Sequence, residues 1–217
     1  GEGAVCDITS AYNTGYMVGD IRRAWLANSK TLDRSVKAAN LAENGTVTEA
    51  VVATSAELKA YSNFSSSNYL SSGSDSDFDF GTGDFSVMFW VKDTDTTEPQ
   101  NLASRSDASL EAGDWLIQAQ SDGLIDFYRH SGSGWVLDAS TTSPATPRST
   151  ATGAVVANQW TQVVAVKRSS KFYWYINGKL SGTPQADANS FTSNSSLTIG
   201  HSLGEIGQTA DNSRLSL

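Results

Sequence analysis

The stretch WTQVVAVKRSSKFYWYINGK, residues 160–179, decides the fold class of this chain. Residue character alternates with period two before and after the polar break RSSK, which is typical of two β-strands joined by a tight turn. In the second strand Phe172 and Trp174 share one face, whereas Tyr173 and Tyr175 share the other. An Asn-Gly pair, which tolerates the positive φ values of a hairpin turn, closes this strand. Two such strands are not stable alone, so we expect a second sheet to cover the Phe172 face.

Further short runs of β-forming residues, separated by turns rich in Gly, Ser, Asn and Asp, predict an all-β chain. We predict these strands at residues 47–53, 57–61, 64–70, 85–91, 102–105, 115–119, 125–130, 135–138, 196–200 and 212–217. Both alternating sets of residues 85–91 are largely apolar, so we expect this strand to be central and covered on both faces. The sequence also allows a short helix over residues 29–37.

Length and charge narrow the class of protein further. The 217 residues suit one domain, which we place at residues 21–217, after a linker or edge segment at residues 1–20. The formal net charge of −8 argues against nucleic acid or an anionic membrane as partner, because both are polyanions. Cys6 is the single cysteine, so no intrachain disulfide can form. No apolar run approaches the roughly 20 residues of a membrane span.

Four segments, taken in order, resemble laminin G-like domains of the concanavalin A-like lectin/glucanase superfamily. They are the pieces Ala24-Trp25-Leu26, Asp33-Arg34-Ser35 and Gly45-Thr46-Val47, the block from Phe78 to Lys92, the hairpin at residues 160–179, and Ser196-Leu197-Thr198-Ile199-Gly200. The resemblance covers residues 21–217 and implies a jelly-roll β-sandwich of two antiparallel sheets. Residues 79–91 resemble such domains in bacteriophage tail and bacterial surface proteins, which implies an extracellular or virion-surface location. The family's last strand usually continues further, so we expect a longer polypeptide.

Catalysis is the first function to weigh, because some relatives are glucanases. Their retaining mechanism uses two carboxylates about 5–5.5 Å apart, which alternate positions of one strand can supply. No two glutamates of this chain lie within five residues of each other, so such a pair cannot form on one strand. A pair from different strands, for example Asp114 with Asp126, stays open. His130 and His201 stand in no recognisable nucleophile motif. We therefore expect a non-catalytic module.

Calcium is the cofactor that the resemblance implies. Jelly-roll relatives often bind Ca²⁺ between the opening Asp-x-Ser turn and the end of the chain. The matching aspartate is Asp33, Asn40 follows in the same connection, and Asp211 is the C-terminal candidate, with Asn212 as an alternative. Carboxylate, amide and carbonyl oxygens are the ligands that Ca²⁺ takes. The alternative is that Asp33 caps a turn or a short helix, as Asp commonly does.

Aromatic residues carry the prediction of sugar binding. A pyranose packs its C–H face on a Tyr or Trp ring while neighbouring polar groups bind its hydroxyls. The candidates are Tyr173, Tyr175, Tyr128, Trp135 and Trp115, and the alternative for each is ordinary cross-strand packing. We thus predict a carbohydrate-recognition module for a glycan or host-surface polysaccharide, as part of a larger phage-tail or adhesive protein. A structural protein–protein module, including a homo-oligomer, and a glycosidase with a non-standard carboxylate pair are the alternatives.

Overall fold

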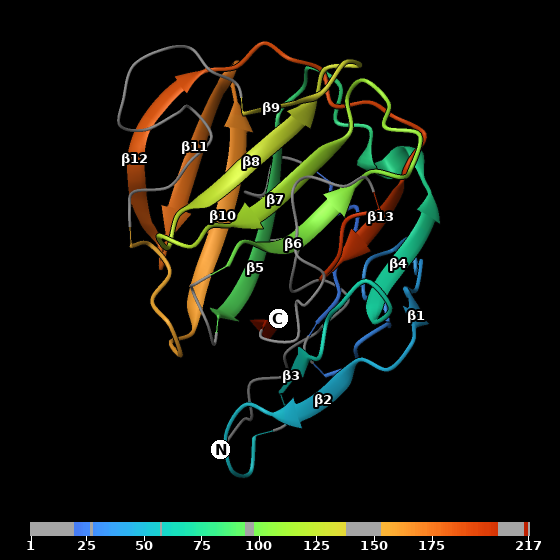
Figure 1. Cartoon of the computed structure of the whole chain (residues 1–217), viewed down its shortest axis with the longest axis vertical. Coiled ribbons are helices and arrows are strands. Elements are labelled where there is room, and N and C mark those ends of the chain that lie inside the picture. Colours follow the sequence, from blue (N-terminus) through green and yellow to red (C-terminus); the bar gives the residue numbers. More distant parts are fainter. Residues whose placement is uncertain are drawn as a thin grey trace, which may run out of the picture.

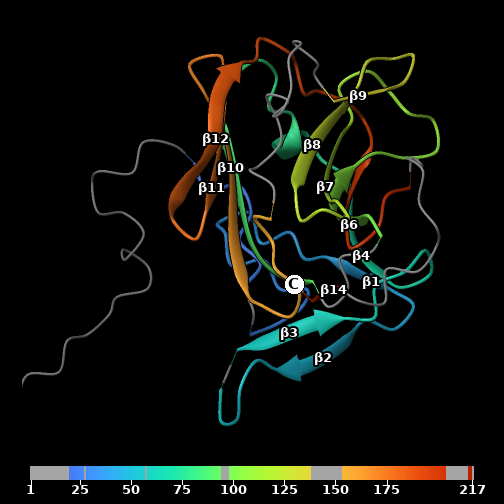
Figure 2. The same cartoon turned by 60° about the vertical axis from the view of Figure 1, so that its left-hand side comes forward.

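The computed structural model describes residues 20–26, 28–56, 58–93, 98–137, 153–203 and 215–216. In this part of the chain the regular structure consists of β-strands and one 3-10 turn, Ser76–Phe78. The strands form two antiparallel sheets that lie face to face, with a small hairpin below them (Figure 1; Figure 2). The predicted jelly-roll class, an all-β sandwich of two antiparallel sheets, is confirmed.

The larger sheet has seven strands in the order β1-β4-β13-β6-β7-β8-β9. Its strands are β1 (Ala42–Asn44), β4 (Tyr69–Ser74), β13 (Ser196–Ile199), β6 (Gln100–Arg105), β7 (Trp115–Ala119), β8 (Ile125–His130) and β9 (Trp135–Leu137). The neighbours β6, β7, β8 and β9 follow one another in the chain as a meander, whereas β13 inserts between β4 and β6 from the far end of the sequence. Long-range pairing of this kind is what sequence patterns alone do not reveal.

The smaller sheet has five strands in the order β12-β11-β10-β5-β14. Its strands are β12 (Lys179–Ala186), β11 (Lys171–Ile176), β10 (Thr161–Arg168), β5 (Phe85–Asp93) and β14 (Leu215–Ser216). The hairpin that opened the sequence analysis is β10–β11, paired from Val163 opposite Ile176 to Arg168 opposite Lys171. A separate hairpin joins β2 (Thr48–Val51) to β3 (Lys59–Ser62).

The core lies between the two sheets and is dominated by aromatic rings. Phe172 and Trp174 of β11 are 1% and 2% exposed, and Phe127 of β8 is fully buried. The rings of Phe127 and Phe172 meet across the sandwich with centroids 5.1 Å apart, and Phe85 of β5 joins them. Full burial of one such side chain contributes about 1.5–3 kcal/mol, so this cluster is what holds the layers together. The expected cover over the Phe172 face is therefore the seven-stranded sheet.

Two expectations about local structure are wrong. Residues 29–37 form turns and an isolated bridge between Trp25 and Asp33, because hydrogen bonds to the Asp33 carboxylate hold this segment in place of a helical ladder. Strand β5 is covered on one face only: Met88 is 64% and Trp90 is 50% exposed. An apolar alternation on both faces thus does not require burial on both, and the exposed face of β5 belongs to a surface described below.

Candidate functional site

The five aromatic residues predicted to bind sugar lie in three different places. Tyr173 and Tyr175 are half-buried on the outer face of the five-stranded sheet, as the alternation along β11 predicts. Tyr128 and Trp135 are half-buried on the outer face of the seven-stranded sheet, whereas Phe127 lies on the inner face, in the core. These two pairs cannot form one site, because the whole sandwich lies between them.

The prediction that Trp115 binds sugar is wrong. Its side chain is 2% exposed and lies in the core between the sheets. Its ring stacks on Phe80 at 5.9 Å and on Phe127 at 5.6 Å. The Gly-, Ser- and Asp-rich loops that flank it in sequence suggested exposure, but the inward parity of β7 decides its position.

A row of polar side chains crosses the outer face of the seven-stranded sheet. The strand register places Asn101 of β6 beside Gln118 of β7, and Gln118 beside Asp126 of β8. Gln118 Nε2 donates to Asn101 Oδ1 at 3.0 Å, and Gln120 Nε2 donates to Gln118 Oε1 at 2.7 Å. Asn101, Gln118 and Asp126 are all buried, so this row is a fixed layer of hydrogen-bonding groups. We call Asn101, Gln118, Gln120 and Asp126 the polar ladder.

Tyr128 is the ring that rises from the polar ladder. Its hydroxyl donates to Asp126 Oδ2 at 3.1 Å and accepts from Gln120 Nε2 at 3.2 Å. Burial, and then the negative charge of Asp126, raise the pKa of the Tyr128 phenol above its ordinary value. The two hydrogen bonds orient the phenol, and part of the Tyr128 side chain is open to solvent.

Trp135 borders the same face at the far edge of the sheet. It pairs with His130 across β8 and β9, and the two rings meet edge to face at 5.5 Å. The Trp135 side chain is half-buried, whereas His130 is buried and accepts a hydrogen bond from the Gly132 backbone. Trp135 and Tyr128 thus place two aromatic rings beside the polar ladder.

The outer face of the five-stranded sheet has a different character. The register aligns Met88, Val164, Tyr175 and Leu180 in one row across β5, β10, β11 and β12. Met88 and Leu180 are 64% and 52% exposed, and Trp90 stands beside Met88 on the same face. We call Met88, Trp90, Val164, Val166, Tyr173, Tyr175 and Leu180 the apolar face. Contiguous exposed apolar surface is a feature of faces that contact another molecule.

The carboxylates Asp114 and Asp126 do not have the spacing of a glycosidase pair. Asp114 lies directly before β7, where its carbonyl accepts a hydrogen bond from the His130 amide. Asp126 lies opposite Gln118, which follows Asp114 by four residues. Four residues of a strand span about 13 Å, which exceeds the separation used by retaining or inverting enzymes. Asp114 is also fully buried, and its burial raises the pKa of its carboxyl group. The arrangement offers no acid–base pair at this place.

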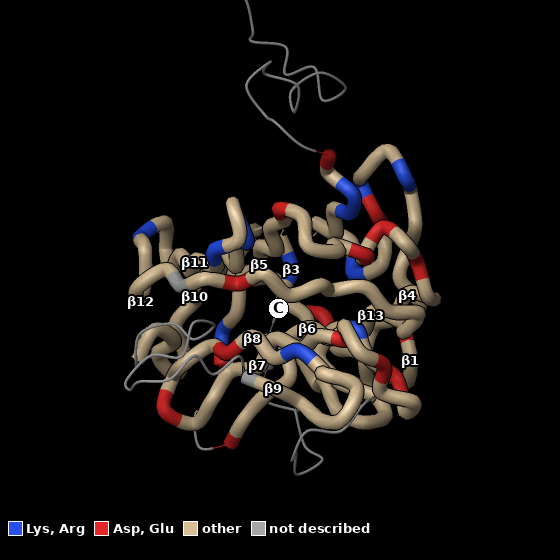
Figure 3. The backbone as a smooth tube through the Cα atoms, turned by 90° about the horizontal axis from the view of Figure 1, so that it is seen from above, with Lys and Arg blue, Asp and Glu red and all other residues tan. Residues whose placement is uncertain are grey.

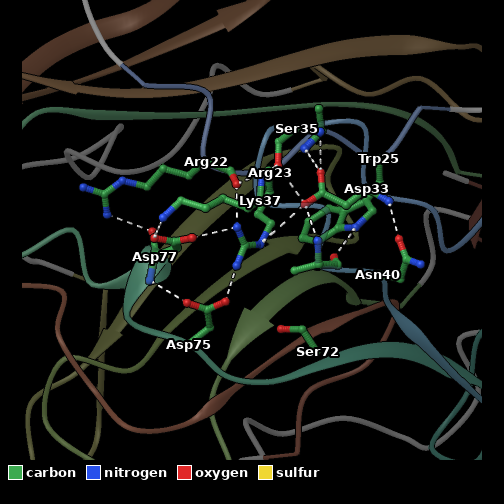
Figure 4. A network of polar contacts seen from close by, with 12 residues as sticks. Arg22, Arg23, Trp25, Asp33, Ser35, Lys37, Asn40, Ser72, Asp75 and Asp77 are labelled. Carbon is green, nitrogen blue, oxygen red and sulfur yellow. Dashed lines mark hydrogen bonds and ion pairs between the residues drawn. The ribbon is translucent and has the colours of Figure 1, made fainter.

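The predicted calcium ligand Asp33 sits in a network of hydrogen bonds (Figure 4). Its Oδ1 accepts from the backbone amides of Ala24 and Ser35, at 2.9 and 2.8 Å. Its Oδ2 accepts from Ser35 Oγ and the Ala39 amide, at 2.8 and 3.0 Å. Burial alone would raise the pKa of Asp33, but these hydrogen bonds outweigh it and hold the pKa below its ordinary value.

Asp33 and Asn40, as placed, do not fit a calcium ion. Both Asp33 oxygens are taken by donors, and Asn40 Oδ1 accepts the Asp33 amide at 3.0 Å. Among the residues that the structure describes, no group of three or more His, Cys, Asp or Glu is placed to hold a metal. The third candidate, Asp211, and its alternative Asn212 lie outside the described residues. A calcium site stays a prediction.

Residues 64–211 match the concanavalin A-like lectin/glucanases superfamily. The chain belongs to this superfamily. The match spans most of the two sheets but begins after Asp33 and Asn40, so the opening segment with the predicted calcium ligands lies outside it. Comparison with curated protein sequences finds no match. No helix in the described part of the chain is long and apolar enough to cross a membrane.

Solved structures show the same superfamily fold at low sequence identity. Domain 4 of AbnA, a GH43 extracellular arabinanase from Geobacillus stearothermophilus in complex with arabinotriose, is 15% identical, with a TM-score of 0.59 over 91% of each chain. The binding domain of botulinum neurotoxin serotype D is 15% identical, with a TM-score of 0.56. A structure of botulinum neurotoxin type C, which interacts with two ganglioside molecules, is 17% identical, with a TM-score of 0.56. Each of these two matches covers 88% of this chain, but only 45% and 44% of the respective neurotoxin chain.

Proposed function

We propose that this lectin-like domain is a non-catalytic carbohydrate-binding module whose ligand lies on the outer face of the seven-stranded sheet. The observation that carries the proposal is the partly exposed Tyr128 ring, which Gln120 and Asp126 hold beside the buried Asn101 and Gln118. A sugar needs an aromatic ring for its C–H face and fixed polar groups for its hydroxyls, and this face supplies both. Trp135 offers a second ring beside it. The buried Asn101 and Gln118 position the ladder rather than contact the ligand.

The charge of this face favours a neutral glycan. The outward residues of β6, β7 and β8 that the structure describes include Asp126 but no Lys or Arg. Asp and Glu also predominate along the seven-stranded side of the molecule (Figure 3). An anionic sugar would therefore meet repulsion from the Asp126 charge, whereas a neutral sugar would not. The arabinotriose complex of a domain with the same fold supports a neutral oligosaccharide as ligand.

A glycan array followed by calorimetry of the best ligand tests the proposal. We expect binding to a neutral glycan, and we expect Tyr128→Ala to weaken it by about tenfold or more, the loss of about 1.4 kcal/mol. Tyr175→Ala, which removes the same ring from the opposite sheet, is the matched control and should leave affinity unchanged. Loss of binding in Tyr175→Ala with normal binding in Tyr128→Ala would instead move the site to the apolar face.

A structural role in an assembly is the second candidate, and the apolar face favours it. We propose that its occupant is a second copy of the chain, because the aligned apolar row of Met88, Val164, Tyr175 and Leu180 can pack face to face against the same row of a second sheet. Light scattering after size exclusion should then show dimers that Met88→Lys dissociates. Val36→Lys, at an exposed valine in the opening segment, is the control. A native protein that is monomeric at high concentration contradicts this role.

A further inference from the structure

A second pair of rings lies on the outer face of the seven-stranded sheet, away from Tyr128 and Trp135. It consists of Tyr69, the first residue of β4, and His201, which follows the end of β13 by two residues. The two ring centroids are 5.2 Å apart, and both side chains are half-buried. These residues come together only through the pairing of β4 with β13, so no local sequence pattern indicates them.

The neighbours of Tyr69 show that its ring lies on the outer face. The next residue, Leu70, belongs to the core, so Tyr69 lies on the opposite side of β4. Asn44 of β1 lies directly opposite Tyr69, and its Nδ2 donates to Ser71 Oγ at 2.9 Å. A fixed amide and a hydroxyl therefore accompany the Tyr69 ring, which is the combination that a sugar-binding face requires.

The Tyr69–His201 pair adjoins the Asn101 end of the polar ladder. The Gly200 amide donates to the Leu102 carbonyl at 2.9 Å, which continues the antiparallel pairing of β13 with β6. Each step forward from Gly200 is therefore a step back from Leu102, so His201 lies toward Asn101.

The polar ladder thus has aromatic rings at both ends. Tyr128 of β8 stands at the Asp126 end, and Tyr69 of β4 stands beyond the Asn101 end. The strands β4, β13, β6, β7 and β8 are consecutive in the sheet (Figure 1). Four strand spacings of about 4.8 Å each separate the two tyrosines, which gives about 19 Å between them. One sugar ring is too short to reach both ends.

On the basis of the proposed function, we infer that the ligand is an extended oligosaccharide that lies across the strands, with one sugar unit on Tyr128 and another on the Tyr69–His201 pair. The units between them pass over the polar ladder, where the half-buried Gln120 is open to contact. A chain held at Tyr128 presents its other end to Tyr69 at a high effective concentration, so the second contact increases affinity. A disaccharide reaches only one end, and the Tyr69–His201 pair thereby selects for chain length.

Calorimetric titration with a size series tests this inference. The probe is the neutral glycan that binds best on the array, prepared in every length from monosaccharide to hexasaccharide. The hexasaccharide should bind the native protein about tenfold more tightly than the disaccharide. Tyr69→Ala should abolish this gain and leave the affinity for the disaccharide unchanged. Tyr128→Ala should weaken the binding of both.

Two control variants separate a binding role of Tyr69 from a structural one. Tyr69→Phe keeps the ring and should keep the gain with length, and Tyr175→Ala, on the opposite sheet, should change neither affinity. Equal affinity of the native protein for the disaccharide and the hexasaccharide would overturn the inference and leave the proposed function standing. The same holds if Tyr69→Ala keeps the gain, or if it weakens both affinities alike. A native protein that binds no member of the series would overturn the proposed function and this inference with it.

Discussion

At the scale of single residues, Asp33 shows how far a local pattern can be interpreted. The Asp-x-Ser turn was assigned either a metal ligand or a cap, and the structure places Asp33 as the acceptor of four hydrogen bonds. Two of its donors, Ser35 and Ala39, are close enough in sequence to have been expected. The ion pairs of Arg23 with Asp75 and Asp77 could not be predicted from a local pattern, because they join residues 52 and 54 positions apart in the sequence.

Asp33→Asn should make the stability of the protein less dependent on acid pH. The pKa of Asp33 is lowered in the folded state, so its stabilising effect is present above its unfolded pKa, near 3.8, and is lost as pH falls through the folded pKa. Urea unfolding at pH 7 should show the variant about 1–3 kcal/mol less stable than the native protein. The difference should shrink at pH 3. Asp20→Asn, at an exposed aspartate, should show no such difference at either pH.

Gly200→Ala should destabilise the sandwich strongly. Gly200 has a φ of +81°, and a Cβ atom there would lie 2.1 Å from the ring of the fully buried Phe64. Strain in the backbone and overpacking together should cost about 2–4 kcal/mol of unfolding free energy. Gly73→Ala is the control, since its Cβ would meet open space. Equal stability of the two variants would show that the segment after β13 adapts to a side chain.

At the scale of elements, alternation predicted the two faces of β11 correctly, but it did not place Trp115 of β7 in the core or show which faces meet. In the segment WLIQAQ, residues 115–120, Gln118 and Gln120 alternate with the core residues Trp115 and Ile117, which indicates that the two glutamines lie on the outer face. Their hydrogen bonds to Asn101 and Tyr128 depend on the register of three strands, which no local pattern reports. Strand β12, which completes the apolar face, was missed because Gly182 and Pro184 lower its strand propensity.

Two neighbouring residues of β11 should respond very differently to truncation. Trp174→Ala should cost about 3–5 kcal/mol of unfolding free energy, because the ring is 2% exposed in the core. Tyr175→Ala should cost about 1 kcal/mol or less, because it removes a half-exposed cross-strand contact. Denaturant titrations of both variants check the prediction. Similar losses for the two would mean that the outer face of this sheet is covered in solution.

At the scale of the whole molecule, the sequence predicted the architecture and left the site unresolved. Two layers follow from alternation and from the need to cover Phe172 and Trp174. The candidate aromatics were predicted as one group, yet strand order sends Tyr128 and Tyr175 to opposite outer faces. The protein therefore has two separate surfaces with different chemistry, one of aromatic and polar groups and one apolar.

The central claim is that a neutral glycan binds on the seven-stranded sheet, and chemical-shift mapping of backbone amides tests it most directly. On addition of the best glycan from the array, we predict shifts concentrated in β6, β7 and β8, around Gln118, Asp126 and Tyr128, with those of β10 and β11 unchanged. Shifts confined to β10 and β11, with none in β7 and β8, would contradict the account.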